Sequence, residues 1–317
     1  MSSPSAFIYR PFQPEADLPR LVALLAAAEA ADQEDDDVSP EAVAAQMAAP
    51  GHDPARDRWV AVAHDQPEVL LGSGALWKAP TAERADLTIT VLPGHRRRGI
   101  GSALLRRVIA HARTLGAASL GAYADARTLA GDAFLRAHGF APVAAYTQLR
   151  VGGEVVPPPA VWPTDYTISR YDSERGFDTL LEAFNRCFEG LWGHNPVTAD
   201  DLTAWLPQLP LDGIFIARGP DGRVAGVVRA EPAPRRSVRN GAPTANVDAP
   251  GVAPQHRDKP LYVPLLLTAW HWARALSPAP ALIELESWGD EPTTLALYQN
   301  LGFALVRRAI SYRLDLP

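Results

Sequence analysis

The sequence predicts an α/β protein of two similar domains, each with a central mixed β-sheet flanked by helices. The chain has 317 residues, which is too long for one ordinary core and suits two domains of about 150 residues each. Segments of one half recur in the other half in the same order. Short apolar segments also alternate with stretches of helical periodicity, and this mixture of hairpins and β-α-β crossovers is typical of a mixed sheet.

The internal repeat rests on four pairs of matching segments. These are Phe7–Arg10 with Tyr166–Arg170, His95–Arg96 with His256–Arg257, Leu135–Val143 with Tyr298–Val306, and Arg150 with Arg313. The third pair shares a Gly-Phe step, and each single arginine follows that Phe by ten residues. Because one repeat specifies one structural unit, we expect two copies of one fold.

A proline-rich segment separates the two copies. Val155–Pro163 contains four prolines, and proline has no backbone N–H and a fixed φ, so the segment neither continues a helix nor pairs centrally in a sheet. We expect a stiff extended linker. The predicted domains are therefore 1–154 and 165–317, joined by the linker 155–164.

The elements of each half follow from periodicity and capping residues. Apolar residues at helical spacing predict a helix over Glu15–Ala31, and Ser39 before Pro40 is a typical helix start. Gly99–Leu115 and Leu129–His138 predict two further helices. Strands are expected in the first half at 6–10, 59–63, 69–77, 85–92, 119–123 and 142–151. The second half repeats the order, with strands near 213–218, 224–231, 245–252, 281–287 and 304–314.

The composition argues against several classes of protein. A net charge of −6 disfavours a nucleic-acid binder, which usually carries a basic face. Cys187 is the single cysteine, so an intrachain disulfide is impossible, and neither a signal peptide nor a membrane-spanning apolar run is evident. No histidine spacing matches a metal site. We expect a cytoplasmic protein without nucleic-acid, membrane or metal partners.

The segment 91–105 is the most informative part of the sequence. A predicted strand ends at Val91 or Leu92, a run of arginines and glycines follows, and a helix then begins. A helix N-terminus presents unpaired N–H groups and a partial positive charge, which suit a phosphate anion. Gly99 and Gly101 leave the backbone open to close approach, and the arginines add charge. A solvated basic turn is the other interpretation, and we favour phosphate binding.

Arg96–Gly101 (RRRGIG) resembles the acyl-CoA loop of the GNAT N-acetyltransferase superfamily. Phe134–Phe140 and Leu297–Phe303 resemble the second signature of that family, once in each half. The tandem arrangement is similar to that of mycothiol synthase-like members. The resemblance implies acetyl-CoA as co-substrate. Its contacts would come from Val91, Leu92 and Pro93 for the acetyl and pantetheine portion, and from Arg96, Arg97, Arg98, Gly99, Ile100, Gly101 and Ser102 for the pyrophosphate.

The resemblance also implies direct attack of an amine on the thioester, with no covalent enzyme intermediate. The amine must first lose a proton, so a base is needed near the strand that precedes the loop. Asp86 and Glu83 are the candidates, although each also fits a solvent-facing charge at a strand end. The acceptor is expected to be a small-molecule or peptide amine. The acidic segment Glu34–Asp37 suits a cationic acceptor. The alternative interpretation is a solvated loop without a binding role.

The two halves depart from the family pattern at different places. A tyrosine that protonates the leaving thiolate in this family corresponds to Leu135 in the first half and to Tyr298 in the second. In the first half, CoA then leaves as a thiolate, or Tyr123, Tyr146 or water supplies the proton. In the second half, Pro260 and Tyr262 replace the two loop glycines, which disfavours a pyrophosphate site.

The first half is therefore the expected acetyltransferase domain. Two alternatives stay open. One is a CoA-binding regulatory or structural protein without turnover, which Leu135 favours. The other is catalysis in the second half with Tyr298 as the acid.

Overall fold

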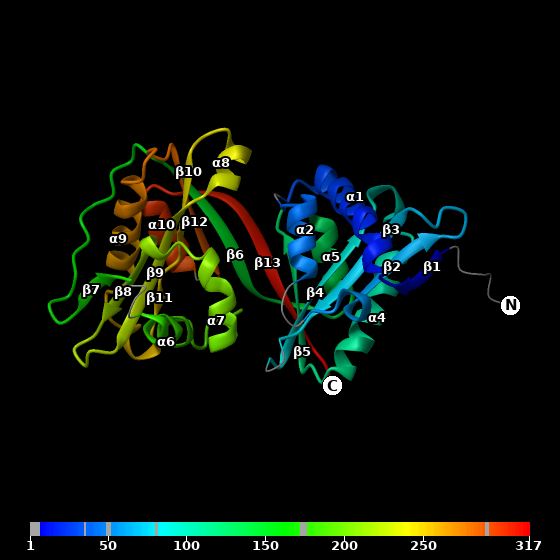
Figure 1. The fold of residues 1–317 in the computed structure, drawn as a ribbon, viewed down its shortest axis with the longest axis horizontal. Helices are drawn as coiled ribbons and strands as arrows, with labels where there is room; N and C mark the ends of the chain where they lie inside the picture. Colours follow the sequence, from blue (N-terminus) through cyan, green and yellow to red (C-terminus); the bar gives the residue numbers. More distant parts are fainter. Residues whose placement is uncertain (1–6, 35, 49–51, 80–81, 172–175, 289–291) are drawn as a thin grey trace. The chain divides into compact units, whose positions relative to one another are not determined.

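The computed structural model describes residues 7–34, 36–48, 52–79, 82–171, 176–288 and 292–317. Contacts between Cα atoms divide the chain into two compact units. Unit 1 comprises residues 1–143 together with Ile310–Pro317, and unit 2 comprises Ala144–Ala309. Each unit is an α/β fold with a mixed sheet, which confirms the predicted fold class (Figure 1).

The sheet of unit 1 has the strand order β1-β2-β3-β4-β5-β13. Its strands are β1 (Phe7–Pro11), β2 (Arg58–Ala63), β3 (Leu70–Trp77), β4 (Arg84–Val91), β5 (Ser119–Asp125) and the end of β13 (Ala304–Asp315). Its helices are α1 (Pro14–Asp32), α2 (Pro40–Met47), α3 (Pro54–Asp57), α4 (Ile100–Thr114) and α5 (Leu129–Ala137), with a 3-10 turn, η1, at Pro93–His95. The ladder is antiparallel from β1 to β4, and β4 and β5 run parallel.

Alternating side chains bury both faces of this sheet. Val60 and Val62 of β2 pack with residues of α1 and α2, whereas Ala61 between them packs with residues of α4. This period of two places α1 and α2 on one face and α4 on the other. We call the first the α1 face and the second the α4 face.

Unit 2 repeats this plan, with the strand order β13-β6-β12-β10-β9-β8-β7 and β11 paired to β9. Its strands are β6 (Ala141–Gly152), β7 (Thr167–Arg170), β8 (Ile214–Arg218), β9 (Val224–Pro232), β10 (Thr244–Asp248), β11 (Gly251–Val252), β12 (Leu282–Trp288) and the start of β13. Its helices are α6 (Phe177–Cys187), α7 (Ala199–Trp205), α8 (Pro234–Asn240), α9 (Tyr262–Arg274) and α10 (Pro292–Asn300). Three 3-10 turns complete it: η2 (Leu206–Gln208), η3 (Leu211–Gly213) and η4 (Pro254–His256).

Both faces of the unit 2 sheet are also covered by helices. Ile214 and Ile216 of β8 pack with residues of α6 and α7, and Phe215 and Ala217 pack with residues of α9. The proline-rich segment predicted as a linker runs along this second core. Val155, Ala160 and Trp162 pack against it, and the carbonyl of Pro158 lies 3.0 Å from His271 Nε2.

The last strand of each half belongs to the unit formed by the other half. β6 pairs with β12 over seven residues, from Gly152 opposite Leu282 to Tyr146 opposite Trp288. The end of β13 lies in unit 1, where Tyr312 is buried and the Leu316 N–H donates to the Ala118 carbonyl at 2.9 Å. The repeat by itself suggests a division near residues 154 and 165, whereas the contacts divide the chain at 143/144 and 309/310. The difference arises from these two closing strands.

Two local features depart from the sequence-based expectations. The strand expected at 245–252 is divided into β10 and β11, because the pairing with β9 shifts by one residue between Val247 and Gly251. Helix α8 was not expected, since its sequence, PRRSVRN, lacks a run of apolar residues. Within the described residues, no helix has the length and apolar character needed to cross a membrane.

Candidate functional site

The parallel strands β4 and β5 separate after a short common ladder. They pair at three positions, Arg84 with Ser119, Ala85 with Leu120 and Asp86 with Gly121. Beyond this point β4 continues to Val91 and β5 to Asp125 without further ladder pairs between these described segments. The carboxyl ends of the two strands therefore diverge, and they leave backbone groups available to an extended ligand. We call this opening the splay and the Asp86–Gly121 pair its apex.

The backbone at the end of β4 shows which groups face the splay. The Leu92 N–H donates to the Leu71 carbonyl of β3 at 2.9 Å. Because successive backbone groups of a strand point to opposite sides, the Val91 N–H points away from β3, toward the splay. Of the three residues predicted to contact the acetyl and pantetheine portion, Val91 thus offers a donor, whereas Leu92 uses its N–H in the sheet and Pro93 has none.

The loop after β4 ends in the N-terminus of α4. Gly99 is the N-cap with φ 84°, a left-handed conformation that favours glycine, and a Cβ there would meet nothing within 4 Å. A Cβ at Gly101 would lie 3.3 Å from the Phe134 ring. The first paired N–H of the helix is that of Ala103, which donates to Gly99 at 3.0 Å. The N–H groups of Ile100, Gly101 and Ser102 are thus the unpaired first turn that an anion requires.

Arg96 is turned back onto the protein. Its Nε donates to the Val91 carbonyl at 3.1 Å, and its two terminal nitrogens donate to the Asp32 carboxylate at 2.7 and 2.6 Å. Arg257, its counterpart in unit 2, likewise donates to the Val252 carbonyl and to the Glu189 carbonyl. The repeated arginine thus joins the loop to the end of the first helix in each unit. Arg97 and Arg98 are exposed.

The two candidate bases occupy different environments. Asp86 lies at the apex, paired with Arg84 Nε at 3.1 Å. A Cβ at Gly121 would lie 2.2 Å from Asp86 Oδ1, so the glycine leaves room for this carboxylate. Glu83 precedes β4 with an exposed side chain, and its carbonyl accepts the Ala118 N–H at 2.7 Å. Of the two, the structure brings Asp86 to the splay.

Leu135 and the two tyrosines considered as proton donors for the first half lie in different environments. Leu135 is buried in the core beneath α4, where it has no polar role. Tyr146 lies in unit 2, and its hydroxyl donates to Glu286. Tyr123 lies on β5, two residues beyond the apex, and 41% of it is exposed.

The corresponding region of unit 2 is closed. β10 and β12 pair over five positions up to Asp248 opposite Glu286, and the Ala249 N–H extends the ladder by donating to Glu286 at 2.8 Å. Tyr262, at the first position of α9, shares a hydrogen bond with Tyr298, whose hydroxyl also donates to Ser287 at 3.3 Å. Tyr298 is fully buried. Tyr262 and Tyr298 thus occupy this region of unit 2, whereas in unit 1 the Phe134 ring lies beside Gly101.

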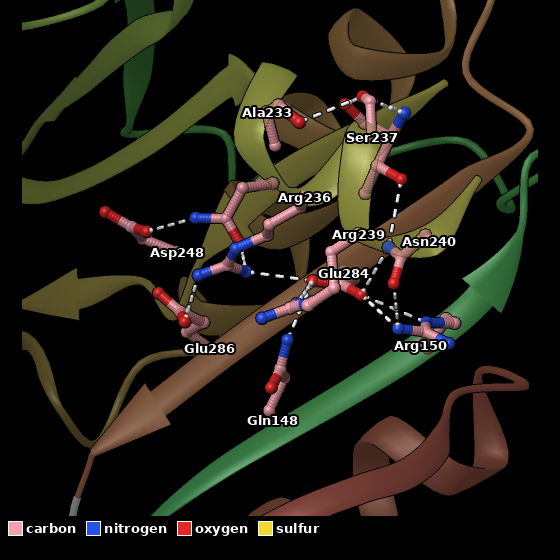
Figure 2. A network of polar contacts seen from close by, with 12 residues as sticks. Gln148, Arg150, Ala233, Arg236, Ser237, Arg239, Asn240, Asp248, Glu284 and Glu286 are labelled. Carbon is pink, nitrogen blue, oxygen red and sulfur yellow. Dashed lines mark hydrogen bonds and ion pairs between the residues drawn. The ribbon is translucent and has the colours of Figure 1, made fainter. Parts of the chain in front are cut away.

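A charged network occupies the position in unit 2 that corresponds to the apex of unit 1. By ladder register, Asn246 stands at the position of Asp86, and Glu284 at that of Gly121. Glu284 is fully buried and accepts bonds from Gln148 at 2.7 Å, Arg150 Nε at 3.0 Å, Asn240 at 3.0 Å and Arg236 at 3.1 Å. Figure 2 shows Arg236 between Glu284 and Glu286, with Arg150 and Gln148 reaching Glu284 from β6. Burial by itself raises the pKa of Glu284, but these donors lower it overall.

This network favours a structural role for Glu284. A carboxylate held by several donors and with a lowered pKa stays ionised and gains little by accepting a proton. Its donors come from β6 and α8, so it joins these two elements to β12. No sequence signal pointed to Glu284, because its partners are far from it along the chain and α8 has no apolar periodicity.

The end of α1, directly before the acidic segment Glu34–Asp37, is tied to the loops around the splay. Arg96 binds Asp32, and Arg127, which also binds Asp125 at 2.9 Å, donates to the Gln33 carbonyl at 2.8 Å. Asp37 accepts from Ser39, which caps α2. Asp35 lies outside the described residues. Among the described residues, no three His, Cys, Asp or Glu side chains gather as a metal site requires.

Comparisons with known proteins agree with this geometry. The model of the acetyltransferase (GNAT) family matches residues 21–140, which include the loop and the splay. A mycothiol acetyltransferase of Thermomonospora curvata is 29% identical over 255 residues, covering 78% of this chain and 80% of that protein. A mycothiol acetyltransferase of Saccharomonospora viridis is 27% identical over 234 residues, covering 71% and 72%.

Two solved structures share the whole architecture. A GCN5-related N-acetyltransferase from Sphaerobacter thermophilus aligns with a TM-score of 0.73 at 20% identity, over 99% of this chain and 97% of the other. A tandem GNAT protein from the clavulanic acid biosynthesis pathway aligns with a TM-score of 0.64 at 20% identity, over 98% of both chains. Residues 21–140 thus carry a domain that matches the GNAT acetyltransferase family, and the whole chain has the fold of tandem GNAT proteins.

The two units therefore hold one open and one closed copy of the same strand, loop and helix arrangement. Unit 1 combines the glycine loop, an unpaired helix start and a splay. Unit 2 keeps the tyrosine of the family's second signature but lacks the open loop. The differences between the copies involve a few side chains, chiefly Gly101 against Tyr262 and Gly121 against Glu284.

Proposed function

We propose that unit 1 binds acetyl-CoA and transfers its acetyl group to the amine of an acceptor by direct attack. The observation that carries the proposal is the combination of the β4–β5 splay with the unpaired first turn of α4 at its mouth. An extended thioester can pair with the free edge of β4 in the splay. A pyrophosphate can accept from the N–H groups at the helix start, where the helix dipole is favourable.

Within this proposal Asp86 is the base. Its carboxylate lies where the strands separate, on the α1 face, opposite the face that α4 covers. The amine of an acceptor entering from the α1 face gives up a proton to Asp86, directly or through one water. Arg84 holds the carboxylate in place. The Val91 N–H on the free edge of β4 is a donor for the thioester carbonyl oxygen, whose negative charge grows during attack.

Unit 2 is a weaker candidate for the same chemistry. Its ladder extends further, its loop contains Pro260 and Tyr262, and its tyrosine pair occupies the space beside the helix start. The specific observation that favours catalysis there is the retained Tyr298. Its full burial and its bonds to Tyr262 and Ser287 disfavour a role as proton donor to a bound thiolate.

The acceptor class follows from the relatives and from the charge around the splay. The two relatives described above carry the name mycothiol acetyltransferase, which makes a small-molecule amine the first class to test. Asp86 and the acidic end of α1 present carboxylates on the α1 face, which suits an acceptor that arrives as an ammonium ion. A CoA-binding protein without turnover remains the second candidate, because Leu135 provides no acid.

Calorimetric titration of acetyl-CoA tests the location of the site. Gly99→Trp places a ring at the mouth of the loop, and Gly116→Trp is the matched control, since Gly116 also has positive φ and open surroundings but follows the far end of α4. We expect Gly99→Trp to abolish binding, and both Gly116→Trp and Tyr298→Phe to retain it. Binding that survives Gly99→Trp would contradict the proposal and move the cofactor to another site.

Amine-dependent release of the CoA thiol then separates the two candidate functions. A panel of small amines that includes glucosamine and cysteamine is added to protein and acetyl-CoA, and free thiol is measured against a control without amine. Faster release with any amine supports transfer, and the acetylated amine is identified by mass. Tight binding without amine-dependent release supports the regulatory alternative.

A further inference from the structure

Unit 1 lacks the tyrosine that its second signature is expected to carry. Leu135 occupies that position and is buried in the core, so it supplies no proton to a departing thiolate. A thiol has a pKa of about 8.5, so help from a donor is useful when the sulfur leaves. If unit 1 transfers an acetyl group, a donor in the splay would therefore accelerate the reaction.

The tyrosines of unit 1 are Tyr9, Tyr123 and Tyr312. Tyr9 lies on β1, which β2 and β3 separate from β4, and its ring packs 4.4 Å from the Arg107 guanidinium. Tyr312 is fully buried in the core beneath α4, and its hydroxyl donates to Asp132. Neither hydroxyl faces the splay.

Tyr123 occupies a different position. It lies on β5 two residues after Gly121, so its side chain and that of Asp86 are on the same face of the sheet. Its neighbours Ala122 and Ala124 point to the other face and are buried, whereas Tyr123 is 41% exposed. We propose that the Tyr123 hydroxyl is the hydrogen-bond donor to the departing CoA sulfur, in place of the residue lost at Leu135.

The surroundings of Tyr123 suit a donor. Burial of the ring and then the nearby charge of Asp86 raise the pKa of Tyr123, and this outweighs the opposing effect of Arg84. The hydroxyl therefore stays protonated at neutral pH. Ser311, which is buried on β13, lies beside it. The C-terminal strand of the chain thus helps to form the candidate site of unit 1.

The proposed acetyl transfer conserves atoms, electron pairs and protons. The acceptor nitrogen forms a bond to the thioester carbonyl carbon, and the carbon–sulfur bond breaks with its electron pair on sulfur. An acceptor that arrives as an ammonium ion first releases one proton to solvent. The neutral amine nitrogen loses its next proton to Asp86 as the new bond forms, and Asp86 then releases this proton to solvent. The sulfur accepts the hydrogen bond and then the proton of Tyr123, and the tyrosine oxygen recovers a proton from solvent. The products are the acetylated amine and CoA thiol.

This inference rests on the proposed function of unit 1, and its test uses the full-length protein. Tyr123→Phe removes the hydroxyl alone, and Tyr9→Phe removes a hydroxyl of the same unit outside the site. Acetyl-CoA binding is measured by calorimetry, and kcat and KM are measured by thiol release with the most reactive amine of the panel. We expect Tyr123→Phe to lower kcat about 100-fold, with unchanged acetyl-CoA affinity and with Tyr9→Phe like the wild type.

The possible results distinguish the two proposals. An unchanged kcat in Tyr123→Phe overturns the role of Tyr123 and leaves the proposed function intact. A raised KM with an unchanged kcat also overturns it, because the tyrosine then only contacts substrate. Absence of amine-dependent thiol release in the wild type overturns both proposals.

Discussion

At the scale of single residues, Asp57 joins the short helix α3 to α4 in unit 1. Its carboxylate accepts from Arg56 at 2.8 Å, from the Asp53 N–H at 2.9 Å and from His111 of α4 at 2.8 Å. Burial by itself raises the pKa of Asp57, but these donors lower it to about 2, against 3.8 for a free side chain. The Asp57 carboxylate therefore stabilises the packing of α4 beside the start of β2, away from the splay.

The lowered pKa of Asp57 predicts that the free energy of unfolding decreases in acid. Because its pKa is lower in the folded state, the stabilisation of about 2 kcal/mol is complete above the unfolded pKa and is lost as the pH falls from about 4 to 2. Asp57→Asn should lower the free energy of unfolding at pH 7 and flatten its dependence on pH in this range. Denaturant unfolding of wild type and variant at pH 7 and pH 3 measures both effects.

Asp65, which is exposed in the turn between β2 and β3, provides the control. Asp65→Asn should leave the free energy of unfolding at pH 7 and its pH dependence unchanged. If Asp57→Asn and the wild type lose equal stability between pH 7 and pH 3, another carboxylate is responsible.

At the scale of elements, the loop between β4 and α4 combines an internal anchor with an exposed basic surface. Arg96 binds Asp32 at the end of α1, whereas Arg98 is exposed at the start of α4. The sequence assigned both residues to the phosphates. The structure gives each a different environment, so their substitutions should have different effects.

Arg96→Gln and Arg98→Gln form a matched pair. We expect Arg96→Gln to lower the free energy of unfolding by about 1–2 kcal/mol, because two charge-assisted hydrogen bonds are lost and Asp32 is left unpaired. We expect Arg98→Gln to leave stability unchanged and to weaken acetyl-CoA binding several-fold, less so at high salt. Denaturant unfolding and calorimetry measure these effects. Weaker binding without lost stability in Arg96→Gln would show that Arg96 leaves Asp32 for the cofactor.

At the scale of the whole molecule, each unit needs a strand encoded in the other half. Unit 1 includes Ile310–Pro317, with Tyr312 fully buried in its core. Loss of one large aromatic side chain from a core costs about 3–5 kcal/mol, which is comparable to the whole stability of a small domain. We therefore expect that the two halves do not fold independently.

This arrangement predicts the behaviour of fragments. Residues 1–143 alone should remain largely unfolded, because the β5 edge is unpaired and the site of Tyr312 is empty. The same fragment with 310–317 attached through a Gly/Ser linker should fold. Near-UV circular dichroism and denaturant unfolding distinguish the two. Cooperative unfolding of 1–143 by itself would contradict the prediction, and the linked fragment with Tyr312→Ala tests whether the buried ring is responsible.

The sequence by itself determined the features that depend on local pattern. Short apolar segments located the strands, helical periodicity located α1, α4 and α5, and Ser39 was correctly identified as a helix cap. The spacing of Gly99 and Gly101 after a strand predicted the helix start that the structure shows. These features depend on residues close together in the chain, so a single sequence can reveal them.

The tertiary structure decided the features that depend on residues far apart in the chain. It placed Asp86 rather than Glu83 at the apex, directed Arg96 to Asp32, brought Tyr123 beside Ser311 and surrounded Glu284 with donors from β6 and α8. It also assigned the two closing strands to the opposite units. Each of these depends on which strands are neighbours and on where side chains point in space. Local propensity carries no information about such contacts, because they form only when the sheet assembles.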